Sequence, residues 1–201
     1  MASFSEALRQ QRWDDHRFYH HSLINQSLHF FSACTFVCCY ALLPVDPGLS
    51  SFIAWTLAMA SRQSGHFFFE PRGYDDVNKV SHEHKEEVKT GYNLFRKYVL
   101  MSIWICSPLL LWISPTLFGM CEPATNWVGV VRHIGYIWLC LGMLAVGFRV
   151  AQLCITQNVQ TGLVWATKIL TDPFSDIKLY HKSPLRLLRG ERMDQAHLAT
   201  K

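Results

Sequence analysis

Charged residues are scarce in this 201-residue sequence, and they are unevenly distributed. They make up 17% of the chain, against about a quarter in soluble domains, while half of the residues are hydrophobic. Asp, Glu, Lys and Arg are absent from four long stretches, at 18–45, 47–61, 98–121 and 150–167. A membrane-spanning helix needs about 20 mostly apolar residues. The composition therefore predicts an integral membrane protein. It excludes a disordered chain, a soluble nucleic-acid binder and a disulfide-stapled secreted module.

The motifs of many soluble enzymes are also missing. The sequence has no phosphate-binding glycine loop, no dinucleotide fingerprint and no G-x-S-x-G elbow, so we expect any enzymatic activity to need no nucleotide cofactor. Its seven cysteines form no C-x-x-C pair, and the odd number argues against a complete disulfide framework. Residues 1–17 are polar and do not resemble a cleaved signal peptide.

The apolar runs predict an all-α membrane bundle with four spanning helices. We place them at 26–43, 49–70, 97–117 and 126–155. Pro108 and Pro115 predict a kink or an early end in the third span. The fourth run is long enough to tilt or to continue as a helix to Ile169. The expected organisation is an N-terminal cytoplasmic helix over 1–25, a membrane domain over 26–169 and a basic tail over 170–201.

The distribution of Lys and Arg orients this bundle. The N-terminal segment holds three of them, the connection 62–97 holds seven, and the tail from Lys168 holds seven, whereas the short turns near Asp46 and Glu122 hold none. The positive-inside rule then places both termini and the connection 62–97 in the cytoplasm. The membrane would be the endoplasmic reticulum in a eukaryote or the inner membrane in a bacterium. Leucines alternate with basic residues in the tail, which predicts binding to anionic membrane lipids.

Histidines are concentrated at the membrane face that this topology makes cytoplasmic. Seven of the ten precede residue 85, and they come from several separate segments of the chain. A single histidine in a membrane helix is usually a polar packing residue, but ionisable groups from several segments at one depth favour a metal site. The expected metal ligands are His20, His21, His29, His66, His82 and His84.

The spacing of these residues adds detail. His66 and Glu70 lie four apart in GHFFFEPRGY and therefore share a helix face. Pro71 then ends the helix, which leaves Glu70 at a C-terminus where a carboxylate is disfavoured, and a nearby cation would explain its presence. The alternative is an ordinary interfacial glutamate paired with Arg72. Ser81 is expected to cap a helix that begins at His82. Imidazole ligands with at most one carboxylate suit non-haem Fe(II), Zn or Mn.

The strings FYHHSLINQSLHF and GHFFFE resemble the multipass family of fungal 2-hydroxy-fatty-acid dioxygenases, the Mpo-like proteins. The resemblance covers residues 18–75, about a third of the chain. It implies an Fe(II)-dependent dioxygenase of the endoplasmic reticulum that acts in α-oxidation. It also implies metal-binding roles for His20, His21, His29 and His66, with Glu70 matching the family's glutamate. The segment from Ser81 and the tail lie outside the match, and the fungal members have more apolar sequence between the two motifs.

This chemistry is consistent with the residue types. A 2-hydroxy acid chelates a metal through its hydroxyl and carboxylate oxygens and leaves a position for dioxygen. One O2 and one 2-hydroxy fatty acid balance to a fatty acid one carbon shorter, carbon dioxide and water, so neither a reductase nor 2-oxoglutarate is needed. We expect Glu70 to bind the iron or to orient an imidazole, and Arg72 to receive the substrate carboxylate as a bidentate partner.

Two other functions remain open at the level of the sequence. His16-x-x-x-His20-His21 imitates one histidine box of the di-iron lipid hydroxylases and desaturases, although that class typically needs about eight histidines in several boxes. The second alternative is a membrane scaffold or transporter with a structural metal. Negligible iron content, together with a His66 variant that only expresses less well, would favour it.

Overall fold

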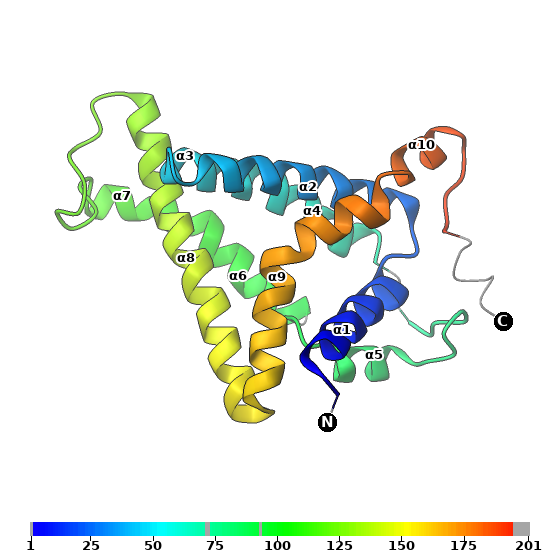
Figure 1. Ribbon diagram of the computed structural model, residues 1–201. Coiled ribbons are helices and arrows are strands. Elements are labelled where there is room, and N and C mark those ends of the chain that lie inside the picture. Colours follow the sequence, from blue (N-terminus) through cyan, green and yellow to red (C-terminus); the bar gives the residue numbers. More distant parts are fainter. Residues whose placement is uncertain (1, 71–72, 93, 195–201) are drawn as a thin grey trace.

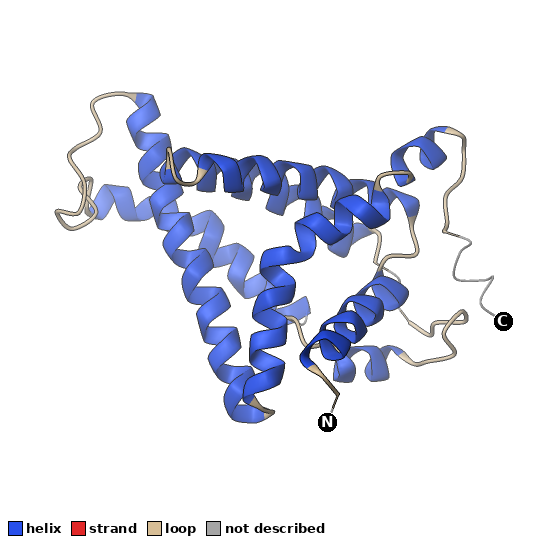
Figure 2. Cartoon of the chain, viewed as in Figure 1, coloured by secondary structure: helices blue, strands red, loops and turns tan. Residues whose placement is uncertain are grey.

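The structure is a computed structural model, in which residues 2–70, 73–92 and 94–194 are described. In these ranges the regular secondary structure is helical (Figure 2), which confirms the predicted all-α class. The helices are α1 (Phe4–Tyr19), α2 (Leu23–Leu42), α3 (Pro47–Ile53), α4 (Ala60–Phe68), α5 (His82–Val88), α6 (Leu94–Cys106), α7 (Leu110–Ile113), α8 (Trp127–Thr156), α9 (Val159–Tyr180) and α10 (Ser183–Leu188). A π-helical segment (Ala54–Met59) joins α3 to α4, and a 3-10 turn (Ser107–Leu109) joins α6 to α7.

Local sequence signals account for where many of these helices begin. A side-chain oxygen of the residue before the helix accepts a hydrogen bond from a backbone N–H of the first turn in α1, α3, α5, α8 and α9. In α5 the cap is the predicted one, because the Ser81 hydroxyl accepts from the backbone N–H of His84 at 3.2 Å. In α3, Pro47 follows the cap Asp46 and supplies a backbone already suited to the first helical turn.

Helices occupy each of the four predicted spans. The first corresponds to α2, the second to the continuous helix from Pro47 to Phe68, the third to α6 with α7, and the fourth to α8. Pro108 lies in the 3-10 turn that interrupts the third, as its missing N–H requires. Two helical stretches, Phe95–Ile113 and Trp127–Thr156, are long and apolar enough to cross a membrane, and few of their residues are buried.

The chain after the fourth predicted span differs from the expectation. α8 ends at Thr156 rather than continuing toward Ile169, and Asn158 caps the separate helix α9. The two helices pack closely next to the turn, since a Cβ on Gly162 of α9 would lie 2.5 Å from Cys154 Sγ of α8. α9 then runs through the predicted boundary at 169/170. It continues because polar residues on one of its faces are buried against other helices, among them Asp172 and Asp176.

The C-terminal segment, expected to be a tail on lipid, packs against the beginning of α2 (Figure 1). The Ser183 hydroxyl donates to Gln26 Oε1 at 2.6 Å, and the backbone N–H of Leu23 donates to the Arg192 carbonyl at 3.0 Å. Asp194 accepts from Gln26 Nε2 at 2.9 Å. These contacts fix the start of α2, the helix that carries His29.

The helical hairpin of α2 with α3 and α4 packs against the hairpin of α8 and α9 (Figure 1). At one end the two hairpins meet backbone to backbone, because a Cβ on Gly135 would lie 1.8 Å from the Gly48 carbonyl oxygen. Beside this contact, Phe52 stacks on Trp138 with ring centroids 5.2 Å apart. At the opposite end of α2 the interior is polar, and there α1, α4 and α9 converge.

Candidate metal centre

Three histidines from three helices meet at this polar end. His20 caps the C-terminus of α1, His29 lies in the second turn of α2, and His66 lies in the last turn of α4. One ring nitrogen of each falls within 4.8 Å of the other two. All three rings are largely shielded from solvent, and His29 is completely buried. Of the six predicted metal ligands, these are the three that the structure brings together.

The outer nitrogen of each ring faces an oxygen atom. His20 Nδ1 lies 3.0 Å from the Asp15 carbonyl oxygen, and His66 Nδ1 lies 2.9 Å from Glu70 Oε2. His29 Nδ1 is 3.6 Å from Asp176 Oδ2, which is longer than a hydrogen bond. A proton on Nδ1 satisfies the first two contacts and leaves Nε2 with a free lone pair. This arrangement is the one that fixes metal-binding histidines in position.

The inner nitrogens are spaced suitably for one ion. His20 Nε2 and His29 Nε2 are 3.2 Å apart. Two nitrogens that are each about 2.1 Å from a metal, at roughly a right angle, lie about 3 Å apart. Without an ion, one of the two rings must donate a proton to the other. Burial, followed by the neighbouring His29, lowers the pKa of His20 well below its usual value and favours the neutral, metal-binding form.

A buried network of ion pairs supports the histidines from behind. Asp176 accepts from Arg62 Nη1 at 2.8 Å, and Asp172 accepts from Lys168 Nζ at 2.7 Å. Lys168 also donates to Asp15 Oδ2 at 3.0 Å, so that α1, α4 and α9 are tied together. Burial alone would raise the pKa of Asp15, but the charges of Lys168 and Arg62 outweigh it and hold that pKa well below its usual value.

Sequence reasoning missed the contribution of α9. It assigned Lys168 and the following basic residues to membrane orientation, yet Lys168, Asp172, Asp176 and Tyr180 are all buried, and Asp176 and Tyr180 lie beside the histidines. The ring of Tyr180 lies 5.8 Å from the ring of His20, and its hydroxyl lies 3.0 Å from His16 Nδ1. The spacing of four between these residues places them on one helix face. The repeat of polar residues at this spacing was the signal in the sequence that could have shown a shared polar face.

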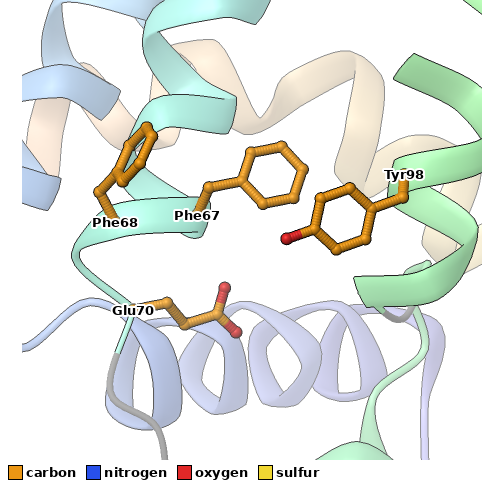
Figure 3. A pocket seen from close by; sticks show the side chains of 4 residues that line it. All are labelled: Phe67, Phe68, Glu70 and Tyr98. Atoms are coloured by element: carbon orange, nitrogen blue, oxygen red, sulfur yellow. The ribbon is translucent and has the colours of Figure 1, made fainter. Parts of the chain in front are cut away.

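Glu70 connects the histidines to the protein surface. Its Oε2 binds His66, and its Oε1 accepts from Lys89 Nζ at 3.0 Å. On its other side an open pocket of about 680 Å³ is lined by Phe67, Phe68, Glu70 and Tyr98. Figure 3 shows the Glu70 carboxylate and the Tyr98 hydroxyl both directed into the space between α4 and α6. The carboxylate predicted to act at the site therefore contacts a histidine of the group.

The remaining predicted residues lie elsewhere. His21 is buried, but its Nε2 forms a hydrogen bond with the Arg17 carbonyl and lies 3.9 Å from Asp75 Oδ2. Its ring therefore contacts Arg17 and Asp75, and His21 is not part of the group of three. His82 and His84 are exposed in the first turn of α5, so the group of three contains neither. Arg72 lies outside the described residues.

Close packing fixes the distance between α2 and α4 next to the histidines. A Cβ on Gly65 would lie 2.2 Å from Asn25 Oδ1 and 3.4 Å from His29 Cδ2. Asn25 is held in turn by the bond from its Nδ2 to the Tyr19 carbonyl at 2.9 Å. Only glycine at position 65 allows this approach, and His66 follows it directly.

The arrangement can hold one divalent ion through imidazole nitrogens. Three protein ligands leave coordination positions open, and no thiolate takes part, so the donor set suits iron, zinc or manganese. Comparison of the chain with family models, curated proteins and solved structures gave no match.

Proposed function

We propose that this protein is a membrane-embedded non-haem Fe(II) dioxygenase that converts 2-hydroxy fatty acids into fatty acids one carbon shorter. The observation that carries the proposal is the group His20, His29 and His66, whose ring nitrogens converge within 4.8 Å. The resemblance of FYHHSLINQSLHF and GHFFFE to the Mpo-like dioxygenases supplies the reaction, and all three histidines lie in those motifs.

The donor set fits a ferrous ion. His20, His29 and His66 would hold it, with Asp15, Asp176 and Glu70 facing their outer nitrogens. When bound, Fe(II) supplies the redox-active Lewis acid that reaction of a chelating 2-hydroxy acid with dioxygen requires. One O2 and one substrate balance to the shortened acid, CO2 and water, so the substrate provides all the electrons.

The surrounding residues of this chain position the histidines and shield them from solvent. Glu70 accepts the Nδ1 proton of His66, which directs the other nitrogen of that ring inward. The buried ring of Tyr180 packs next to the rings of His20 and His29 and shields them from solvent. The ion pairs among α1, α4 and α9 pair the carboxylates near the histidines with cations, which offsets the cost of burying their charges.

The proposal includes a four-span topology with both termini in the cytoplasm. Two helical stretches, Phe95–Ile113 and Trp127–Thr156, are long and apolar enough to span. We propose that α2 and the helix from Pro47 to Phe68 form the other two. The concentration of Lys and Arg at 62–97 and at both ends of the chain supports this orientation. The histidine group would then lie at the cytoplasmic rim, within reach of a fatty acid in the bilayer.

The test is metal content beside product analysis. Protein purified in detergent without oxygen should carry one iron per chain, and adding O2 with 2-hydroxypalmitic acid should release CO2 and pentadecanoic acid in equal amounts. Palmitic acid, which lacks the 2-hydroxyl, is the control and should not react. Iron-loaded protein that consumes no 2-hydroxy acid contradicts the proposal.

The same experiment separates the alternatives. Two irons per chain would favour the di-iron hydroxylases, although in the described residues one histidine group of three is present. A buried ion that stabilises the fold without any turnover would favour a scaffold or transporter with a structural metal.

A further inference from the structure

The pocket beside Glu70 has a chemistry that the histidine group does not explain. It is lined on one side by Phe67 and Phe68 of α4 and on the other by Tyr98 of α6 (Figure 3). Phe67 and Tyr98 stack with ring centroids 5.0 Å apart, while Phe68 is 78% exposed. An aromatic-lined opening with a few polar groups is typical of a ligand site.

Two lysines lie next to this pocket, and their donors are used differently. Lys89 Nζ donates to Glu70 Oε1 at 3.0 Å and to Glu86 Oε1 at 3.2 Å, and it also lies over the ring of Tyr19. Lys97 Nζ lies 4.0 Å from Glu70 Oε2, too far for a hydrogen bond. Within the described parts of the chain, Lys97 therefore keeps its N–H donors unused, although its side chain is only 13% exposed.

The position of Lys97 argues against a role limited to membrane orientation. A lysine that only orients a span reaches outward to water and lipid headgroups. Lys97 is instead largely covered and approaches Glu70, which lines the pocket. The next residue, Tyr98, directs its hydroxyl into the same space. Lys97 thus lies beside a residue that lines the pocket, and the phenol of Tyr98 is directed into the pocket itself.

We infer that Lys97 binds the carboxylate of a long-chain fatty acid, with Tyr98 as a hydrogen-bond donor and Phe67 and Phe68 against the first part of the chain. Lys97 lies at the beginning of the candidate span Phe95–Ile113. A carboxylate bound there would lie at the membrane surface, and the acyl chain would extend along the apolar span. The 2-hydroxy substituent of this ligand rests on the proposed function, whereas recognition of the carboxylate does not.

The residue expected from the sequence to bind the substrate carboxylate is a different one. Arg72 was the expected partner of the substrate carboxylate, and it lies outside the described residues. Lys97 takes that role here on three observations: its burial, its unused donors and the aromatic pocket beside it.

The experiment measures equilibrium binding of palmitate and of methyl palmitate to the purified full-length protein. Both probes lack the 2-hydroxyl group, so neither is a substrate. Lys97→Met should weaken palmitate binding by about 10-fold or more, the loss expected for a charge-assisted hydrogen bond, and leave methyl palmitate unchanged. Lys97→Arg should retain the preference for palmitate, and Phe68→Gln should weaken both probes equally. The matched control is Lys178→Met, an exposed lysine of α9.

The outcomes are distinguishable from those of the proposed function. Unchanged palmitate binding in Lys97→Met, or an equal loss for both probes, overturns the inference. It is also overturned if Arg72→Ala removes the preference for palmitate while Lys97→Met keeps it. Lys97-dependent binding of palmitate in a protein that turns over no 2-hydroxy acid upholds the inference and refutes the dioxygenase.

Discussion

His20 Nε2 and His29 Nε2 face each other across 3.2 Å in the interior, although they are nine positions apart in the chain and belong to different helices. The end of α1 makes this possible, because His20 leaves the helix with φ −115° and ψ 45° and turns its ring toward α2. With a proton on its Nδ1, His20 has a free lone pair on Nε2, which can accept a hydrogen bond from His29 or bind a cation.

Metal binding should therefore depend on these three histidines. We expect His20→Ala, His29→Ala and His66→Ala each to abolish or strongly reduce iron per chain, because each removes one imidazole of the group. His82→Ala and His84→Ala are the matched controls and should keep full metal content, since both rings are exposed. Metal analysis of the purified variants decides the matter, and full iron in His29→Ala would refute the assignment. Added Fe(II) should also raise the melting temperature of the wild type and not that of His29→Ala.

Glu70 should act through His66. Glu70→Gln keeps the shape of the side chain but weakens the bond to His66 Nδ1, and such changes typically lower metal affinity or activity by about 10- to 100-fold. We expect this variant to keep some iron and turn over slowly, whereas His66→Ala loses both. Glu86→Gln is the control, because Glu86 shares Lys89 with Glu70. Equal iron affinity and rate in Glu70→Gln and wild type would exclude the role.

The parts of the site that sequence reasoning identified are those carried by local motifs. His20, His29, His66 and Glu70 are recognisable because they lie within short strings at the ends of apolar runs. The helices themselves follow from the lengths of those runs and from caps such as Ser81. Both depend on residues close in sequence.

The missing parts depend on contacts between distant segments. Asp15 and Lys168 are 153 positions apart, and their ion pair exists because α9 folds back across α1. The turn between α8 and α9, at Gln157 and Asn158, was hidden within a charge-free stretch, which was interpreted as the end of a long span. Lys97 was likewise counted as one more cytoplasmic charge, since nothing in its neighbours in the sequence shows that it faces Glu70.

The buried ion pairs should contribute strongly to stability. Lys168→Met leaves Asp15 without its cation, whereas Asp172 keeps its ion pairs with Arg12 and Arg62. We therefore expect a loss at the lower end of the about 3–5 kcal/mol that breaking a buried pair costs. Lys178→Met, an exposed change on the same helix, should alter stability by less than about 0.5 kcal/mol. Thermal unfolding in detergent measures both, and similar melting temperatures for the two variants would contradict this view.

The pH dependence of that difference has a defined sign. Burial alone would lower the pKa of Lys168, but Asp15 and Asp172 outweigh it and raise the pKa above its usual value. A group whose pKa is raised on folding contributes stability that is fully present below its unfolded pKa, about 10.4 for lysine. The advantage of wild type over Lys168→Met should therefore be constant between about pH 7 and pH 9 and decline only as the pH rises through the folded value. A decline already below about pH 8 would show that another group is responsible.

The four-span topology predicts which positions share a side of the membrane. Single cysteines placed at Lys79 and Lys182 in a cysteine-free background should react with an impermeant thiol reagent from the cytoplasmic side. A cysteine at Glu122 should react only from the opposite side, because the turn there lies beyond the third predicted span. Labelling of Lys79 and Lys182 positions from opposite sides would rule out four spans.

Adding a single methyl group at Gly65 should disturb the metal centre. An alanine there places a methyl group 2.2 Å from Asn25 Oδ1 and 3.4 Å from His29 Cδ2, so that either Asn25 or α4 must shift. Because His66 is the next residue, we expect Gly65→Ala to lower iron per chain and activity together. Gly147→Ala in α8 is the matched control, since a Cβ there meets nothing within 4 Å and alanine favours a helix by about 0.5–1 kcal/mol. Iron content, activity and melting temperature measured side by side separate a local effect from unfolding. If Gly65→Ala keeps full iron and activity, the spacing of α2 and α4 does not govern the metal centre.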